Sequence, residues 1–263
     1  MVVDLALSRF EKYGVWAASI VAVLIVWEYL SGSGMVSALV LPSPLKIALT
    51  FERMISNGQM FVDIWTSTAR IIAGFTVAFL VALPLGLLSG SNQIIRNIMR
   101  PWVQLTQPIP GIAWVPFAFL IFGLSNNAAI FVIAIACFFP IFINVGNAVQ
   151  RFDRDLINVA KTLGAGRLQI FTKVIIPGVF PDIVTGSRVA MGFAWRTVVA
   201  AEIIGLPHGV GALLIAAKNT AQTDAVIVSM ITLGVLMIVF EKVIFDTMEK
   251  SIQRWKSAEQ GEG

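Results

Sequence analysis

Three ionisable side chains, Arg188, Arg196 and Glu202, lie in or beside the apolar segment 181–205, and their types could bind a charged ligand. Ionisable groups in a segment of this kind are costly, and they usually face a cavity or a charged partner. The guanidinium of Arg196 carries a permanent charge in a bidentate fork that suits nitrate, carboxylate or sulfonate. We therefore expect Arg196 either to line a substrate pathway or to form a structural ion pair with Glu28 or another buried acid.

Residues able to perform covalent chemistry are scarce. The single cysteine, Cys137, excludes an internal disulfide and a multi-cysteine metal site, and the single histidine, His208, cannot build a metal site alone. No G-x-x-x-x-G-K-[ST] motif occurs, so we expect no ATP binding through a P-loop. A membrane enzyme would need clustered catalytic polar residues. We expect no catalytic residue, no metal site and no cofactor bound by this chain.

Composition places the chain in the membrane. Of its 263 residues, 57% are hydrophobic and 13% are charged, whereas a soluble domain is about a quarter charged. Several apolar runs reach the roughly 20 residues needed to cross a bilayer. We expect an all-α, polytopic membrane protein with about six transmembrane helices. The expected spans are residues 14–30, 69–89, 100–123, 127–149, 181–205 and 225–245.

The third expected span, residues 100–123, contains Pro101, Pro108, Pro110 and Pro116. A continuous helix loses a hydrogen bond at each interior proline. Irregular backbone at membrane depth survives only where protein or a water-filled cavity covers it. Two readings stay open: a broken segment that faces the protein interior, or one kinked helix.

Lysine and arginine are shared unequally between the loops. Most of them lie in the two termini, in the loop after the second span and in the segment 153–177, whereas Lys46, Arg53 and Lys218 lie on the opposite side. Because basic loops remain in the cytoplasm, we expect the N-terminus, the C-terminus and the segment 153–177 to be cytoplasmic. The net charge of +4 is then explained by the orientation of the chain in the membrane. A nucleic-acid partner would require a basic cluster on one folded face, and we expect none.

The segment 153–177 shows a helix, a stop and a second amphipathic turn. Apolar residues recur there at helical spacing: Leu156, Val159, Ala160 and Leu163. Gly164 follows them as a natural helix stop, because glycine takes positive φ without steric cost. This pattern indicates a docking surface. A charged surface loop is the simpler alternative.

This segment resembles the cytoplasmic EAA loop of importer-type ABC transporter permeases. The spacing from Asn158 to Gly164 and on to Pro177 matches that loop, although Asn158 stands in the place of the family's glutamate. In the family the loop lodges in a groove of the ATP-hydrolysing subunit and transmits its motion. The resemblance thus implies an ATPase-coupling loop made by Asn158, Val159, Ala160, Leu163, Gly164, Ala165, Val174 and Pro177.

Further motifs resemble the nitrate, sulfonate, taurine and bicarbonate branch of these permeases. They are LPSP at residues 41–44, QPIPGIAWVP at 107–116, GFAW at 192–195 and VAAE at 199–202. Together they cover most of residues 41–211. The implied fold is the type I ABC importer permease fold, with residues 1–263 as a single transmembrane domain and about 69–249 as its core.

The resemblance also implies a function and a set of partners. The chain would be the membrane-spanning permease subunit of an ATP-driven importer in the bacterial inner membrane, moving a small anion such as nitrate, bicarbonate or an organic sulfonate. The implied partners are two ATPase subunits that hydrolyse ATP with Mg, a periplasmic or lipid-anchored binding protein, and a second permease copy. The expected pathway residues are Pro110, Trp114, Trp195, Arg196 and Glu202.

Two alternatives remain for the transported solute and the energy source. Permeases of the same family also carry other small organic molecules. A secondary transporter driven by an ion gradient would be expected to show internal repeats or acid pairs at mid-membrane, and neither is evident in the sequence.

A row of small residues, Gly186, Ala190 and Ala194, allows close helix packing, either within one subunit or across a dimer.

Overall fold

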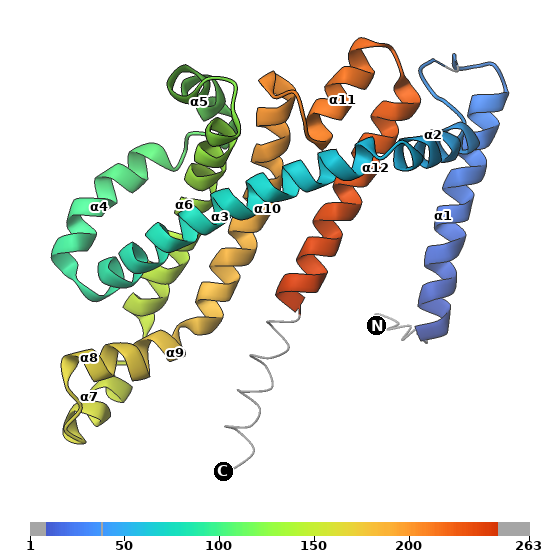
Figure 1. Ribbon diagram of the computed structural model, residues 1–263. Helices are drawn as coiled ribbons and strands as arrows, with labels where there is room; N and C mark the ends of the chain where they lie inside the picture. The colour runs from blue at the N-terminus through green and yellow to red at the C-terminus, as the bar shows by residue number, and fades with distance from the viewer. Residues whose placement is uncertain (1–8, 38, 247–263) are drawn as a thin grey trace. The chain divides into compact units, whose positions relative to one another are not determined.

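The computed structural model describes residues 9–37 and 39–246 of the chain, and all regular elements within these ranges are helical (Figure 1). In chain order they are α1 (Arg9–Gly32), α2 (Pro44–Ser56), α3 (Gln59–Ser91), α4 (Gln93–Thr106), η1 (Gly111–Trp114), α5 (Val115–Phe122), α6 (Asn126–Arg151), α7 (Arg154–Thr162), α8 (Arg167–Ile170), η2 (Phe171–Ile175), α9 (Ile176–Gly178), α10 (Phe180–Gly205), α11 (Val210–Asn219), α12 (Thr223–Phe240) and η3 (Glu241–Asp246).

Four of the described helices are long and apolar enough to cross a membrane, and two bent helix pairs raise this number to as many as six. The four are Gly14–Gly32, Gln59–Ser91, Asn126–Arg151 and Thr223–Val243, and the bent pairs are Gln93–Thr106 with Gly111–Phe122 and Arg167–Gly178 with Phe180–Gly205. The predicted all-α, polytopic fold is thereby confirmed.

The described chain divides into two compact units. The terminal unit contains residues 9–61 and 213–231, and the core unit contains residues 62–212 and 232–246. The expected single domain over residues 1–263 stays a prediction.

In the terminal unit, the LPSP motif fixes the start of α2. The Ser43 side chain accepts the N–H of Lys46, and Pro44 occupies the first turn, where a missing N–H costs nothing. The indole N–H of Trp27 donates to the carbonyl of Pro42 at 3.0 Å. The motif therefore acts as a helix cap that also joins α1 to α2.

The core unit is built on α6, which packs along α10 and is crossed by α3 (Figure 1). Ile133, Cys137 and Ile141 follow one another at single-turn spacing on α6 and are fully buried. Small residues let the neighbouring helices approach: a Cβ added at Gly90 of α3 would lie 2.5 Å from the Cβ of Val149. Small residues thus allow the helix backbones to approach closely, and this contact holds the helices together.

The row of small residues on α10 packs inside the subunit. A Cβ added at Gly186 would lie 2.9 Å from the Cβ of Asn144 on α6. Ala190 and Ala194 are fully buried, and the Cys137 thiol donates to the carbonyl of Ala190. Of the two arrangements left open by the sequence, the contact within one subunit is the one observed.

The third expected span is broken and is not one kinked helix. α4 and the η1–α5 segment meet at 89°. Pro101 lies inside α4, Pro116 lies in the first turn of α5, and Pro110 holds extended backbone between the two helices. Pro101 is accommodated within α4, whereas Pro108 and Pro110 lack the N–H that would continue the helical hydrogen bonding, so the chain turns at residues 107–110.

Candidate functional site

The expected coupling loop begins with α7, a short helix that is capped at both ends. At its start the Asp153 side chain accepts a backbone N–H of the first turn. At its end Gly164 adopts φ of 82°, and its N–H donates to the carbonyl of Lys161. The N–H of Ala165 donates to the carbonyl of Ala160, which completes a Schellman motif. α7 therefore ends in a defined turn, as the sequence predicts for Gly164.

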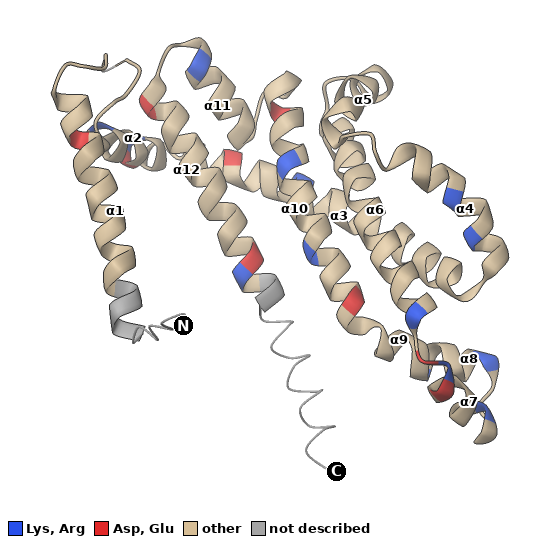
Figure 2. Cartoon of the chain, turned by 180° about the vertical axis from the view of Figure 1, so that it is seen from behind, with Lys and Arg blue, Asp and Glu red and all other residues tan. Residues whose placement is uncertain are grey.

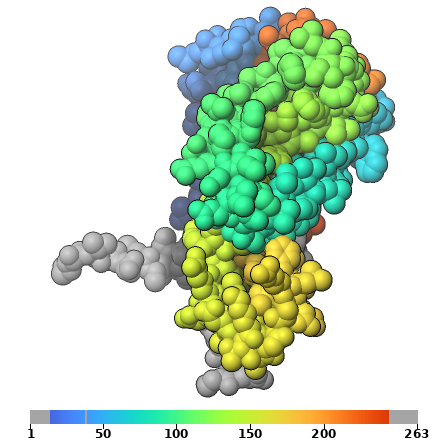
Figure 3. All heavy atoms as spheres, turned by 90° about the vertical axis from the view of Figure 1, so that its left-hand side faces the viewer, coloured from blue at the N-terminus to red at the C-terminus, as the bar shows by residue number. Residues whose placement is uncertain are grey.

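α7 lies at an end of the core unit (Figure 3), and it exposes one apolar face there. Ile157 and Ala160 pack against the buried core, whereas Leu156, Val159 and Leu163 are exposed, Leu163 by 81%. We call Leu156, Val159 and Leu163 the α7 face. The helical spacing predicted these apolar positions, but Ala160 belongs to the inner side because the core unit covers it.

The part of the loop that follows α7, residues 165–178, packs against the core unit, and we call it the second limb. Val174 and Ala165 pack against the buried core, and Ile175 is itself buried. Pro177 lies in α9, just before the 56° bend into α10, while the Asn158 side chain on α7 is exposed. The loop thus exposes α7 on the surface of the core unit, and its second limb continues directly into α10.

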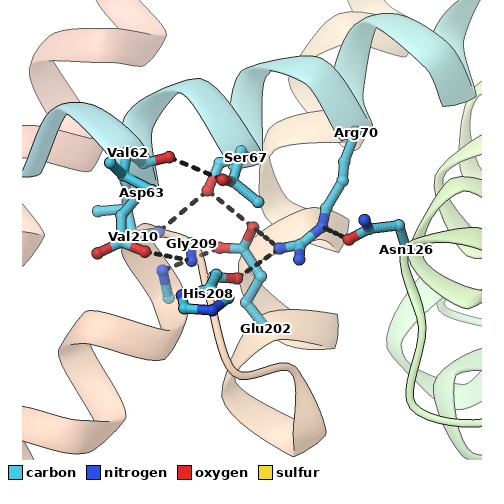
Figure 4. Close-up of polar contacts among 11 residues, drawn as sticks. Val62, Asp63, Ser67, Arg70, Asn126, Glu202, His208, Gly209 and Val210 are labelled. Atoms are coloured by element: carbon cyan, nitrogen blue, oxygen red, sulfur yellow. Dashed lines mark hydrogen bonds and ion pairs between the residues drawn. The ribbon is translucent and has the colours of Figure 1, made fainter. Parts of the chain in front are cut away.

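A buried polar cluster (Figure 4) lies near the end of α10 that is remote from α7 (Figure 1). Its centre is an ion pair between Arg70 Nη1 of α3 and Glu202 Oε1 of α10 at 2.8 Å, with side-chain exposures of 4% and 0%. Arg70 also donates to Asn126 Oδ1 at 2.9 Å and to the carbonyl of His208 at 2.6 Å. The Ser67 hydroxyl donates to Glu202 at 2.7 Å. Both charges are therefore removed from solvent, and each is paired and hydrogen-bonded. A buried charge without such partners would strongly destabilise the fold.

The same cluster caps the start of α11. The first N–H groups of a helix have no partner within the helix, and here side chains of α3 and α10 accept them. The pairs are Gly209 N to Asp63 Oδ1 at 2.8 Å, Val210 N to Ser67 Oγ at 3.0 Å and Gly211 N to Glu202 Oε2 at 2.9 Å. The cluster consequently joins α3, α6, α10 and the first turn of α11.

Two hollows adjoin one another along α10. The proline hollow, of about 430 Å³, is lined by Gln107, Pro110, Asn144 and neighbouring apolar residues. The arginine hollow, of about 370 Å³, is lined by Arg188, Trp195, Arg196 and Glu241 among others. Val189 and Phe193 line both hollows, so this face of α10 separates them.

The expected pathway residues do not gather at one point. Pro110 lines the proline hollow, and Trp195 and Arg196 line the arginine hollow. Glu202 lies in the buried cluster instead of facing a hollow, because Arg70, Ser67 and Gly211 occupy its carboxylate. Trp114 is half-buried near the break between α4 and α5.

Arg196 is exposed, and its guanidinium carbon lies 5.8 Å from the ring centroid of Phe193. Within the described residues of the core unit, no carboxylate oxygen lies within 4.0 Å of it. Arg188, by contrast, contacts Glu241 at 2.8 Å. The indole N–H of Trp195 is buried and has no hydrogen-bond partner among the described residues. Donors without an acceptor therefore lie along the arginine hollow.

Comparison with known proteins decides the family. The family model described as binding-protein-dependent transport system inner membrane component matches residues 82–255. The chain belongs to this family. It is a membrane-spanning permease subunit of an ABC importer, and the predicted resemblance is confirmed.

Several relatives share most of the permease's length. A probable ABC transporter permease protein of Brucella abortus (strain 2308) is 34% identical over 230 residues, covering 88% of this chain and 90% of its own. The putative aliphatic sulfonates transport permease protein SsuC of Bacillus subtilis is 31% identical over 254 residues, or 95% and 91% of the two chains. The nitrate import permease protein NrtB of a Synechocystis strain is 31% identical over 238 residues, or 87% and 85%.

A solved structure shares the permease's fold. A chain of the MetNI methionine ABC transporter, in an inward-facing conformation, superposes with a TM-score of 0.67 at 19% identity, covering 76% of this chain and 98% of that chain. The predicted type I importer permease fold is therefore confirmed. As an importer permease the chain is not itself an enzyme, and it works with an ATPase and a substrate-binding protein.

Sequence reasoning missed half of the buried cluster. It singled out Glu202 but not its partner Arg70. The missed signal was the spacing of Asp63, Ser67 and Arg70, which places all three on one face of a helix. α3 begins at Gln59, earlier than the expected residue 69, because these polar side chains are buried against other helices of the permease.

Gly209 is expected to be intolerant of any side chain. It adopts φ of 125°, and an added Cβ would lie 2.2 Å from Glu202 Cδ. Gly209→Ala should therefore lower the free energy of unfolding by about 2–4 kcal/mol, through backbone strain and displacement of the carboxylate. The thermal unfolding midpoint of the detergent-purified permease measures the loss.

Gly58→Ala is the matched control for this prediction. Gly58 also has positive φ, 75°, but no atom would lie within 4 Å of its added Cβ. Gly58→Ala should lower the free energy of unfolding only by the cost of the strained backbone, about 1–2 kcal/mol. Equal losses in Gly209→Ala and Gly58→Ala would contradict a clash with Glu202.

Proposed function

We propose that this permease imports a small anion across the bacterial inner membrane, as one of two identical copies with an ATPase subunit docked on each α7 face. The proposed docking of the ATPase rests on the α7 face. Leu156, Val159 and Leu163 are exposed on a helix whose two ends are capped. An amphipathic helix of this kind buries its apolar face in a groove of a partner.

The direction of insertion rests on charge. The first turn of α4 and the helices α7 and α8 carry Arg96, Arg154, Lys161 and Arg167, and basic segments of this kind remain cytoplasmic (Figure 2). The N- and C-terminal segments share this side in the proposal, although residues 1–8 and 247–263 lie outside the described residues. The α7 face is then available to a cytoplasmic ATPase, and the buried cluster lies toward the side from which a binding protein delivers solute.

The proposed cycle needs no chemistry from this chain. The partner ATPases bind and hydrolyse ATP with Mg, and their closure displaces the two coupling loops. Because the second limb of each loop runs through Pro177 into α10, a displacement of α7 reaches the helix that separates the two hollows. Such a permease alternates between two conformations that a ligand on another chain favours unequally.

Two observations support an anion as the solute. Relatives of this chain are named as permeases for aliphatic sulfonates, taurine and nitrate. The exposed guanidinium of Arg196 and the unpartnered indole N–H of Trp195 both belong to residues that line the arginine hollow. A fixed positive charge with an adjacent donor suits nitrate, bicarbonate or an organic sulfonate.

Uptake by the reconstituted complex tests this proposal. The permease is placed in proteoliposomes with its partner ATPase and binding protein, and ATP-dependent uptake of nitrate, bicarbonate and ethanesulfonate is measured against a neutral solute. Arg196→Gln should reduce anion uptake about tenfold, a loss of roughly 1.4 kcal/mol, and Arg196→Lys should fall between it and wild type.

Lys242→Gln removes an exposed lysine of η3 that lines neither hollow and lies outside the coupling loop, and it should transport like wild type. Unchanged affinity and rate in both Arg196 variants would remove Arg196 from the pathway. Uptake of the neutral solute with no anion uptake in wild type would contradict the anionic substrate.

A further inference from the structure

α4 is amphipathic, and its two faces differ sharply. Its N-terminus is capped by the Asn92 side chain, which accepts the N–H of Ile94. Large apolar side chains are exposed along one face: Ile94, Ile98, Trp102 and Leu105. The other face carries polar side chains in a stripe that we call the α4 stripe: Arg96, Arg100, Gln104 and Gln107.

The α4 stripe lines a third hollow, of about 360 Å³, between α4 and α6. Its polar lining is Arg96, Arg100, Gln104 and Gln107 from α4 and its end, with Asn147 and Gln150 from α6 and Ser89 from α3. No aspartate or glutamate lines it. The α4 hollow is therefore a site with positive charge, amide donors and no competing carboxylate.

Arg96 and Arg100 lie one turn apart on the same side of α4, and basic residues of α4 are blue in Figure 2. Like charges at this spacing destabilise a helix. Within the described part of the core unit, neither arginine has a carboxylate oxygen within 4.0 Å. An anion held between the two guanidinium groups would relieve their repulsion and accept hydrogen bonds from both.

The α4 hollow continues into the proline hollow. Gln107 and Ile143 line both of them, and Asn144 lies on α6 at the next position. The Asn144 amide donates to the carbonyl of Pro140 at 2.8 Å, so its position is fixed. Polar side chains thus line both adjoining hollows, from Arg96 in the first turn of α4 to Gln107 at the break in the third span.

We propose that the α4 stripe is an exit-side binding track for the transported oxyanion, with Arg96 and Arg100 as its charged residues. This inference rests on the proposed import of a small anion. It adds a second positively charged position, toward the cytoplasmic end, to the one at Arg196. Successive weak sites let an ion enter and leave, whereas one tight site would retain it.

An anionic lipid headgroup offers the same oxygen chemistry as a small oxyanion. The geometry favours the solute, because the exposed apolar face of α4 is the side suited to acyl chains, and the arginines lie on the other side, toward α6. Amide side chains next to the arginines also suit the successive contacts of a small moving ion.

Uptake with the double variant Arg96→Gln/Arg100→Gln tests the track. The complex of permease, ATPase and binding protein is reconstituted in phosphatidylcholine vesicles, and uptake of whichever of nitrate, bicarbonate or ethanesulfonate wild type transports is measured. We expect the maximal uptake rate to fall at least about tenfold. The KM for the loaded binding protein and the amount of co-purified ATPase should not change, since Arg96 and Arg100 are not part of the α7 face formed by Leu156, Val159 and Leu163.

Arg151→Gln/Lys242→Gln is the matched control. It removes the same charge from exposed residues that do not line the α4 hollow, and uptake should stay within about twofold of wild type. If the first double variant does not fold, Arg96→Lys/Arg100→Lys replaces it. That variant keeps the charge without the fork, and it should transport at an intermediate rate.

The outcomes separate the inference from the function on which it rests. No uptake of any of the three anions by the wild-type complex would overturn the proposed function. Normal wild-type uptake with uptake in Arg96→Gln/Arg100→Gln within twofold of it would overturn the track alone. A defect that appears only when phosphatidylglycerol is added to the vesicles would identify a lipid headgroup as the ligand and would likewise overturn the track.

Discussion

Replacement of Glu202 by alanine is expected to lower the free energy of unfolding of the permease by about 3–5 kcal/mol. The Arg70 guanidinium would remain buried beside His208 and Asn126 without its counter-charge, and its side chain is only 4% exposed. The N–H of Gly211 would also lose its acceptor at the start of α11. The thermal unfolding midpoint in detergent, or the fraction that elutes as a single species in size-exclusion chromatography, measures the loss.

Related variants separate charge from shape in this cluster. Glu202→Gln removes the charge and keeps a single acceptor oxygen, which can serve Ser67 or Gly211 but not both, so its stability should lie between those of wild type and Glu202→Ala. The double variant Arg70→Ala/Glu202→Ala leaves neither charge buried, and it should lose less than the sum of the two single losses.

Asp182→Ala is the control on the same helix. Asp182 lies 3.8 Å from Arg151 in an exposed pair, with exposures of 45% and 73%, and such a pair contributes less than about 1 kcal/mol. If Glu202→Ala is no more costly than Asp182→Ala, the cluster does not stabilise the fold in the way described.

Leu163→Asp is expected to weaken association with the ATPase by about 2 kcal/mol or more, roughly 30-fold. Leu163 is the most exposed residue of the α7 face, at 81%, and a carboxylate there would be desolvated without a partner when the face docks. Transport should fall with the loss of association. Co-purification of the ATPase with the permease, at matched membrane levels of the permease, measures the effect.

Thr162→Asp provides a matched control for the α7 face. It adds the same charge at the neighbouring position, about 100° away around the helix, outside the set formed by Leu156, Val159 and Leu163. Association of the ATPase with Thr162→Asp should stay near that with wild type. Full retention of the ATPase by Leu163→Asp would show that the α7 face is not the docking surface.

Features that depend on neighbouring residues could be predicted from the sequence. The stop of α7 at Gly164 follows from glycine's freedom at positive φ, and the break at residues 107–110 follows from proline chemistry. The membrane class follows from the length of the apolar runs. Each of these properties is set within a few residues, so no knowledge of distant contacts was needed.

Features that depend on contacts between helices could not be predicted. Glu202 and Arg70 are far apart in the chain, and the sequence does not state that α10 and α3 meet at this point. For the same reason Ala160 was expected on the exposed face of α7, although the core covers it. The α4 stripe was overlooked because the segment was considered for its prolines and not for the period of its polar residues.

The buried cluster at one end of α10 has a mechanical consequence. Glu202 fixes that end of the helix to α3 and the start of α11, whereas the other end continues through α9 into the coupling loop. At a rise of about 1.5 Å per residue, a rigid rotation of about 5° about Glu202 would move the Pro181 end by roughly 3 Å and Arg196 by less than about 1 Å. The cluster would then serve as a pivot, so that the amplitude of movement along α10 is greatest near Pro181 and small beside Arg196.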